Sequence, residues 1–565
     1  MNAKRRVVET RRFRIDRLVA AFTKAPPLSV TILLIVIGAL LRVWQYLANS
    51  SLWIDEAALA RNIIDRPVSA LFHGLSYAQV APVGFLLVEK GAVTLFGTSE
   101  YALRAFPLAC GILSQILFWQ VAKRVLNGWS VPFAVGLLSF GIPFIYFSSQ
   151  VKQYSSDVAA AVLLLLAAIE IRRRGVTGAR ARWFGLVGAI IVWFSQPAAF
   201  VLAGIGSALL IMAWTEGDVL AARTYAIMGV LWAASASAAA LLAMRNLSDM
   251  DRDYFQAFWA EGFMPFPPAS MADLGWLPNK LVWAFGKFAS GMGRTSGGLN
   301  YRWSAIFTIT MLVGVWALWN SEKNRDAALF VGLPVVVVAV LSAAKLYPFT
   351  ARLFTFLLPG LLLATAAGAE QVLASWPSRA QLLTPAFLAV LGGSPIYAIA
   401  TALPPFWLQH LRPVMEHMTA RRERGDAVYV FFGAGQAFHY YAQRYGLTMD
   451  NTVVGRCSIE RPDQYLQQLD QFRGEPRVWI LLTHDRSEGK PVIIDYLDRI
   501  GRRLEAVEVP GSSGRGVEAA SGYLYDLSDP KKLTAAASSS IAIAGQTIGL
   551  SPRWECYGVG LSESP

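Results

Sequence analysis

The chain has 565 residues, of which 55% are hydrophobic and only 16% are charged, and its mean hydropathy is +0.41. Because about a quarter of the residues of a soluble domain are charged, this composition excludes an ordinary soluble protein and indicates a polytopic membrane protein. The net charge of +13 does not indicate nucleic-acid binding, because the basic residues flank apolar segments and no basic patch alternates with aromatic residues on a polar domain.

The N-terminal residues 1–27 are rich in Lys and Arg and predict a cytoplasmic basic arm. The apolar segment from Leu28 to Leu47 has about the 20 residues that a bilayer core requires, and it predicts an uncleaved first helix. Further spans bring the predicted total to about eleven, and they lie near residues 105–121, 131–147, 158–171, 183–195, 198–214, 226–244, 303–319, 327–344, 353–369 and 382–403.

Two adjacent carboxylates, Asp55 and Glu56, follow the first apolar segment. Residues 57–71 have apolar side chains at roughly helical spacing and predict an amphipathic helix on the membrane surface. A carboxylate at that surface could activate a hydroxyl group. The alternative is that Asp55 serves only as the N-cap of this helix.

The segment of residues 83–96 is apolar but short, and Glu89 and Lys90 lie in its middle. The basic arm and the Arg172-Arg173-Arg174 run should both be cytoplasmic, so an even number of crossings must separate them. About four unambiguous spans lie between them, so we expect residues 83–96 to lie along the outer interface. The cytoplasmic side then receives residues 123–124, 172–174, 215–223, 321–326 and 370–381. The outer side receives residues 49–104, 148–157, 245–302, 345–352 and everything after about residue 404.

Two of the short outward loops carry chemistry. Lys152, Tyr154 and Asp157 lie in one of them, and charged residues beside membrane spans are costly unless they are paired or functional. The alternative is that Lys152 extends to water and Asp157 caps the next helix.

In another outward loop, Lys345 and Arg352 bracket Tyr347. Two cations there could hold an anionic headgroup, since Arg binds phosphate bidentately. Anchoring at the membrane interface is the alternative. Together the loops suit a donor with a lipid phosphate and an acceptor hydroxyl, which a carboxylate would deprotonate as it attacks.

Residues 404–530 alternate predicted strands (426–432, 478–482, 523–527) with predicted helices (436–444, 492–499), which indicates a small α/β domain outside the membrane. Gly433 and Gly435 follow the first strand, but a lone G-x-G is more typical of an ordinary tight turn than of a phosphate loop. Residues 531–565 are expected to form a mobile tail. Cys457 and Cys556 could pair outside the cytoplasm, although nothing in the sequence requires it.

Several motifs resemble those of a known family, and in chain order they are Trp53-Ile-Asp55-Glu56-Ala, Gln79-x-Ala-Pro82, Glu100-x-x-x-Arg104, Lys152-Gln-Tyr-Ser and Tyr347-Pro-x-x-x-Arg352. They resemble the GT-C superfamily of integral-membrane glycosyltransferases. Within it, the chain is most similar to the bacterial branch related to protein O-mannosyltransferases and to lipid A aminoarabinose and galacturonic acid transferases. The resemblance covers roughly residues 28–403 and implies a GT-C-like transmembrane domain there, with a catalytic first outer loop at residues 49–104.

The resemblance implies transfer of a single sugar from a polyprenyl-phosphate-linked donor to a lipid, glycan or protein acceptor. The reaction would take place on the outer face of a bacterial inner membrane, with the C-terminal domain in the periplasm. Asp55 is the implied base, with Glu56 beside it and Asp157 as a second acid. The candidate donor-phosphate and substrate contacts are Gln79, Lys152, Tyr154, Lys345, Tyr347 and Arg352.

One departure from the family concerns the phosphate. Many members have Lys-Pro-Pro in the first outer loop, and this chain has Val80-Ala81-Pro82, so phosphate binding must come from elsewhere. Arg245, Arg252 and Lys280 are further possibilities. Some members bind a divalent metal ion near the acids and others need none; the five histidines show no ligand spacing, so metal use stays open and no metal is assigned.

Two other functions compete with this reading. A glycan polymerase or ligase also uses lipid-linked sugars, but it moves oligosaccharides. A transporter or flippase should place ionisable residues within its spans near the bilayer midplane. Here they gather at the outer ends of the spans, which favours an enzyme.

Overall fold

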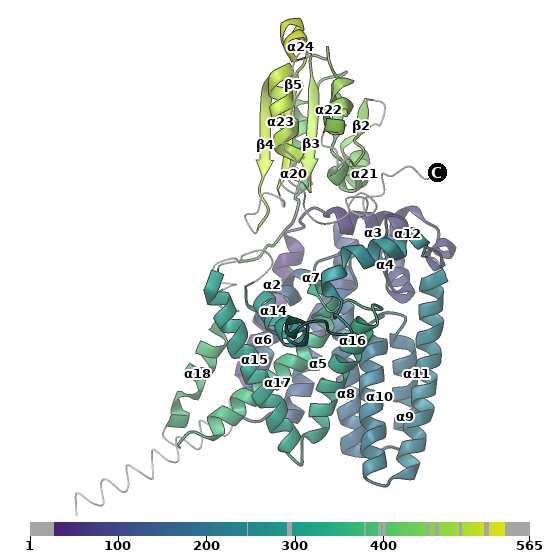
Figure 1. The fold of residues 1–565 in the computed structure, drawn as a ribbon, viewed down its shortest axis with the longest axis vertical. Helices are drawn as coiled ribbons and strands as arrows, with labels where there is room; N and C mark the ends of the chain where they lie inside the picture. Colours follow the sequence, from purple (N-terminus) through teal and green to yellow (C-terminus); the bar gives the residue numbers. More distant parts are fainter. Residues whose placement is uncertain are drawn as a thin grey trace, which may run out of the picture.

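The computed structural model describes residues 28–245, 247–290, 297–377, 380–393, 397, 403–447, 451–457, 463–484, 489–512 and 519–536. A bundle of long apolar helices carries a small α/β domain at one end (Figure 1). The predicted fold class, a polytopic α-helical membrane protein with a small C-terminal α/β domain, is therefore confirmed. The basic arm (residues 1–27) and most of the C-terminal tail lie outside the described residues.

The helices of the bundle and its outward loops are α2 (Leu28–Leu47), α3 (Ile54–Asp65), η1 (Val68–Phe72), α4 (Val83–Phe96), α5 (Glu100–Val125), α6 (Ser130–Phe140), α7 (Ile142–Phe147), α8 (Tyr154–Arg174), α9 (Gly178–Ile191), α10 (Ala198–Thr215), α11 (Val219–Arg245), α12 (Asp249–Phe258), η2 (Ala260–Gly262), α13 (Met271–Leu274), α14 (Trp276–Ser290), α15 (Gly297–Asn320), α16 (Arg325–Ala343), η3 (Ala351–Leu357), α17 (Leu358–Ala374), η4 (Ala380–Leu383) and α18 (Thr384–Leu391). Residues 83–96 form a helix with the predicted bounds.

Eight helical segments of the described part are long and apolar enough to cross a membrane, and they lie in α2, α5, α8, α10, α11, α15, α16 and η3–α17. The predicted number of about eleven spans is not confirmed within the described residues. Residues 183–195 fall on α9, which has only 14 residues. Residues 382–403 contain the eight-residue helix α18, and part of this range lies outside the described residues.

The predicted span at residues 131–147 is broken at Gly141 into α6 and α7. Pro143 has no N–H to donate to the carbonyl four residues earlier, so the helix cannot continue unchanged. The buried guanidinium of Arg42 donates instead to the carbonyls of Ser139 and Leu138, both at 3.1 Å. The carbonyl groups at this helix break thus receive hydrogen bonds from a charged side chain of α2, because backbone polar groups inside a membrane must be hydrogen-bonded.

The loops predicted to be cytoplasmic meet at one end of the bundle. Arg172, in the last turn of α8, lies 2.6 Å from Glu216, the C-cap of α10, and 2.9 Å from Asp326, in the first turn of α16. Glu370 accepts from the backbone N–H of Asn127 at 3.0 Å. The charged residues that the sequence predicts to be cytoplasmic therefore lie at the same end of the bundle. Which side of a membrane that face occupies stays a prediction.

The α/β domain, called the outer domain after its predicted location, consists of α20 (Leu411–Arg421), β1 (Ala427–Val430), η5 (Phe432–Ala434), α21 (Gly435–Ala442), η6 (Gln443–Tyr445), β2 (Thr452–Val454), α22 (Asp463–Asp470), β3 (Val478–Thr483), α23 (Gly489–Ile500), β4 (Arg502–Val509), β5 (Ala520–Asp526) and α24 (Pro530–Ala536). The strand order is β2-β1-β3-β5-β4. The strands β1, β2 and β3 are parallel, and β5 is antiparallel to β3 and β4. Every residue of the central strand β3 is buried, as its continuous apolar run requires.

The predicted strands in this domain correspond to β1, β3 and β5, and the predicted helices to α21 and α23. The edge strands were missed: β2 has only three residues, and β4 alternates charged with apolar residues. Cys457 is disulfide-bonded; Cys556, the partner that the sequence allows, lies outside the described residues.

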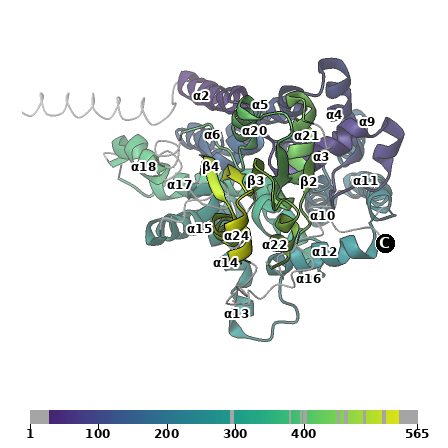
Figure 2. The same cartoon turned by 90° about the horizontal axis from the view of Figure 1, so that it is seen from above.

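The outer domain and the first outward loop share one apolar core. Leu59 and Ile63 of α3 pack in the same buried cluster as Val430 of β1 and Phe438 of α21. Seen from above, α3 and α21 lie side by side (Figure 2). The apolar side of α3 therefore faces the outer domain, where the sequence suggested the bilayer surface.

Candidate functional site

The site is built around Asp55, in the first turn of α3. The N-cap of this helix is Trp53, which makes no side-chain capping bond, so Asp55 is not the N-cap that the sequence left as an alternative. Its carboxylate lies 2.7 Å from the guanidinium of Arg352, and both side chains are partly buried. The structure thus brings together the first acid of the first outward loop and the cation of the last.

Three aromatic rings surround the guanidinium of Arg352. Its central carbon lies 5.5 Å from the ring centre of Trp53, 5.8 Å from that of Tyr154 and 5.5 Å from that of Trp259. Such rings attract a cation through their electron-rich faces. They also hold the planar side chain in one orientation, with Nε buried and without a hydrogen-bond partner among the described residues.

Lys152 forms the second cation of the site. It is 94% buried, and its Nζ donates to Oε1 of Gln79 at 2.5 Å. Gln79 in turn donates to the carbonyl of Tyr77 at 3.1 Å. Lys152 therefore does not extend to water, and it reaches the first outward loop next to Val80-Ala81-Pro82. Burial lowers the pKa of Lys152 to about 8, although the nearby charge of Asp55 opposes this effect.

The charge state of Asp55 follows from its neighbours. Burial by itself raises the pKa of this carboxyl, but Arg352, Lys152 and His484 together outweigh burial and hold the pKa below its usual value. Asp55 is consequently a carboxylate at neutral pH. Such a group can accept a proton from a hydroxyl but cannot serve as an acid.

Glu56 points away from this site, because consecutive helical residues project about 100° apart. Arg104 donates to the carboxylate of Glu56 from Nε to Oε1 at 3.2 Å and from Nη2 to Oε2 at 3.0 Å. The backbone N–H of Val151 donates to Oε1 at 2.8 Å. Burial raises the pKa of Glu56, and Arg104 offsets this only in part. Glu56 thus joins α3, α5 and the second outward loop.

Tyr154, Asp157 and Tyr347 extend the site inward. Tyr154 lies within electrostatic range of Asp55, Asp157 and Arg352, and Tyr347 lies within range of Asp157. Asp157 is buried in the first turn of α8 and is not its N-cap, which is Gln153; its Oδ1 has no hydrogen-bond partner within the described part of the chain. The Tyr347 hydroxyl donates to the carbonyl of Leu353 at 2.9 Å.

Some candidate cations lie elsewhere. Lys345 is exposed, with a positive φ of 57°, and makes no ion pair with a described residue. Arg245 is exposed as well, Arg252 pairs with Asp249 at 3.2 Å, and Lys280 donates to the carbonyl of Glu261 at 2.7 Å. Arg352 and Lys152 are therefore the two cations that the structure brings to Asp55.

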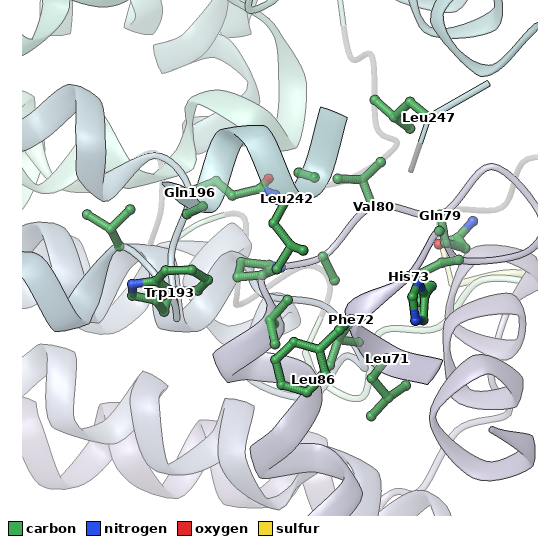
Figure 3. Close-up of a pocket in the computed structure, with 18 residues that line it drawn as sticks. Leu71, Phe72, His73, Gln79, Val80, Leu86, Trp193, Gln196, Leu242 and Leu247 are labelled. Atoms are coloured by element: carbon green, nitrogen blue, oxygen red, sulfur yellow. The ribbon is translucent and has the colours of Figure 1, made fainter. Parts of the chain in front are cut away.

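A pocket adjoins the loop that carries Gln79. Its wall is mostly apolar and includes Leu86 of α4, Trp193 between α9 and α10, and Leu242 of α11 (Figure 3). Gln79 lies at this wall and also bonds Lys152. The polar site and the apolar pocket are therefore adjacent.

The described residues contain no group of three or more His, Cys, Asp and Glu side chains that could hold a metal ion, and metal use stays open. Two site residues were missed from the sequence. Trp259 contacts Arg352, and His484 of the outer domain lies near Asp55. Neither stands in a recognisable motif, and only the folded chain brings them to the site.

No protein-family model and no curated protein matches this chain. Among solved structures, ArnT from Cupriavidus metallidurans bound to undecaprenyl phosphate is similar over 87% of this chain and 97% of its own, with 11% identity and a TM-score of 0.45. An oligosaccharyltransferase from Archaeoglobus fulgidus is similar over 79% of this chain and 67% of its own (11% identity, TM-score 0.43). The mycobacterial arabinofuranosyltransferase AftD is similar over 90% of this chain and 42% of its own (13% identity, TM-score 0.43). These proteins are GT-C glycosyltransferases.

Proposed function

We propose that the chain is a glycosyltransferase that moves a single sugar from a polyprenyl-phosphate donor to a hydroxyl group of a lipid, glycan or protein acceptor. One observation carries the proposal: the carboxylate of Asp55 lies 2.7 Å from Arg352, with Lys152 close enough to lower its pKa. A base and two cations in one partly buried place are what this reaction needs. The motif resemblance given above points to the same chemistry.

The reaction balances with the residues present. The acceptor oxygen attacks the anomeric carbon and forms the new C–O bond, and the bond from that carbon to the phosphate oxygen breaks. Asp55 takes the proton of the acceptor hydroxyl. The polyprenyl phosphate leaves without being protonated, and Arg352 and Lys152 stabilise its increased negative charge.

Lys152 supplies the charge that the first outward loop lacks. Many family members place a lysine where this chain has Val80-Ala81-Pro82. The ammonium of Lys152 reaches the same loop from α8's side and bonds Gln79. When a phosphate arrives, Lys152 can exchange a neutral amide partner for an anion, which strengthens the interaction.

The pocket beside Gln79 would receive an apolar part of a lipid substrate. Its wall is apolar and part of it belongs to α11, many of whose side chains are exposed along the bundle. We place the reaction on the outer face of a bacterial inner membrane, with the outer domain in the periplasm. Cysteine labelling of intact cells at residue 65 of α3 would test that orientation.

The decisive experiment replaces Asp55 by Asn in the full chain, purified in nanodiscs. Transfer is measured from polyprenyl phosphates that carry one labelled hexose or pentose, with envelope lipids as acceptors. The proposal expects a loss of about 10²–10⁴-fold in turnover, the range of general-base catalysis. Asp65→Asn is the matched control, since Asp65 lies on the same helix and its side chain is 58% exposed. Near-normal turnover of Asp55→Asn would remove Asp55 as the base, and a product longer by several sugars would favour a polymerase.

A further inference from the structure

His484 is held at the boundary between the outer domain and the site. It directly follows β3, whose C-terminal end is turned toward the first outward loop, and its φ is 55°. The turn packs tightly against η5, which follows β1: a Cβ on Gly433 would lie 2.6 Å from the carbonyl oxygen of Thr483 and 2.8 Å from Cβ of His484. Gly433 therefore allows η5 to approach the end of β3 closely, and this contact positions the backbone and Cβ of His484.

A chain of hydrogen bonds connects His484 to α3. The backbone N–H of Ile54, the residue before Asp55, donates to Oε1 of Gln409 at 3.3 Å. The Nε2 of Gln409 lies 2.5 Å from Nδ1 of His484. Gln409 is 95% buried, and its amide oxygen and amide nitrogen are both engaged in these two contacts.

This chain selects the tautomer of the imidazole. Because the N–H of Ile54 can only donate, the amide oxygen of Gln409 must face it and the amide nitrogen must face His484. The amide nitrogen is a donor, so Nδ1 of His484 accepts and carries no proton. The proton of the neutral ring is then on Nε2, on the side opposite the Gln409 bond.

We infer that His484 is a positioning residue of the glycosyl-transfer site: the outer domain supplies an imidazole Nε2–H that orients the carboxylate of Asp55 for proton acceptance. The inference rests on the proposed function. Three facts support it: the hydrogen-bonded route from His484 to the residue next to Asp55, the selected tautomer, and the close packing at Gly433 that holds the backbone and Cβ of His484. His484 also lies within electrostatic range of Asp55.

The inference assigns the outer domain a role beyond bracing the loop. A carboxylate held by Arg352 at one oxygen still has lone pairs that must point at the acceptor hydroxyl. A second donor from the other side restricts its rotation. The orientation of a base affects turnover more than it affects binding of the donor.

The test compares His484→Phe with His484→Gln in the full chain. Phe keeps the ring shape without a donor, and Gln places an amide N–H near the former Nε2. We expect His484→Phe to lower kcat at least tenfold with little change in KM for the donor, and His484→Gln to recover most of that loss. His417→Phe is the matched control, because His417 lies in the same domain and pairs with Glu505 at 3.0 Å.

Each outcome is decisive. A His484→Phe variant with full kcat overturns the inference, and so does an equal loss in both variants when both remain folded by thermal unfolding. Asp55→Asn, measured alongside, separates the two proposals. If Asp55→Asn is inactive while His484→Phe is fully active, only the inference fails. If the wild-type chain transfers no sugar from any polyprenyl-phosphate donor, the proposed function itself fails.

Discussion

The guanidinium of Arg352 lies 2.7 Å from the carboxylate of Asp55, although Asp55 belongs to the long first outward loop and Arg352 to the short loop of residues 345–352. This ion pair connects two outward loops that are far apart in the sequence. Its geometry also means that a phosphate must share Arg352 with Asp55. Binding of the donor and the readiness of the base are therefore coupled through one side chain.

Substitution of Arg352 should affect both donor binding and the base. Arg352→Lys loses the planar fork and the contacts with Trp53, Tyr154 and Trp259, so KM for the donor should rise about tenfold. In Arg352→Gln the cation that lowers the pKa of Asp55 most is absent, so this pKa rises. The acidic limb of the kcat/KM profile should then move to higher pH. An unchanged acidic limb would contradict Asp55 as the titrating base.

Lys152 should govern the alkaline limb. Its pKa of about 8 means that the free enzyme loses this positive charge as the pH rises through about 8. We expect kcat/KM for the donor to fall across that range, and the limb to move to higher pH in Lys152→Arg, because Arg keeps its charge. Lys345→Arg is the control, since Lys345 is exposed. Identical alkaline limbs in wild type and Lys152→Arg would exclude Lys152 as the group that titrates.

The buried ion pair between Glu56 and Arg104 should contribute more to stability than an exposed ion pair does. Both side chains are at most 2% exposed, and loss of one partner leaves an uncompensated buried charge, which costs about 3–5 kcal/mol. Glu56→Gln should therefore lower the thermal unfolding temperature clearly. Asp65→Asn breaks an exposed pair and should cost about 0.5 kcal/mol or less. Equal unfolding temperatures for the two variants would show that the buried pair is dispensable.

Glu100 should hold the outer domain in place. Its carboxylate pairs with Arg412 at 2.9 Å and Arg444 at 3.1 Å, and accepts from the hydroxyl of Tyr441 at 3.0 Å. Glu100→Gln removes the charge that both arginines share, so limited proteolysis between the bundle and the outer domain should become faster and sugar transfer slower. Glu416→Gln is the control, because Glu416 is 55% exposed. Equal proteolysis rates would indicate that the apolar core, and not the ion pairs of Glu100, holds the outer domain on the bundle.

Much of this arrangement could be predicted from the sequence. The length of the apolar runs predicted the first helix and the bounds of residues 83–96, because both depend on local composition. The charged outward loops identified Asp55, Lys152 and Arg352 as candidates, and these do meet. The sequence did not predict that Glu56 turns to Arg104, since that depends on the helical phase of α3 and on a partner in α5.

The rest depends on contacts between distant segments. Trp259 and His484 reach the site only through the packing of α12 and β3, and neither has a motif around it. The break at Gly141 is stabilised by Arg42 from another helix, so an apolar run that reads as one span becomes two helices. The strand β4 alternates charged with apolar residues because it is an edge strand, and its pairing with β5 is a tertiary property.

The common core of α3 and the outer domain has a consequence for biosynthesis. The loop that bears Asp55 leaves the ribosome long before β1 and α21, against which α3 packs. Until β1 and α21 have been made, Leu59 and Ile63 are not covered by the residues against which they pack in the folded protein. A nascent chain of this protein therefore acquires the native surroundings of α3 only after β1 and α21 have been made and have folded against it.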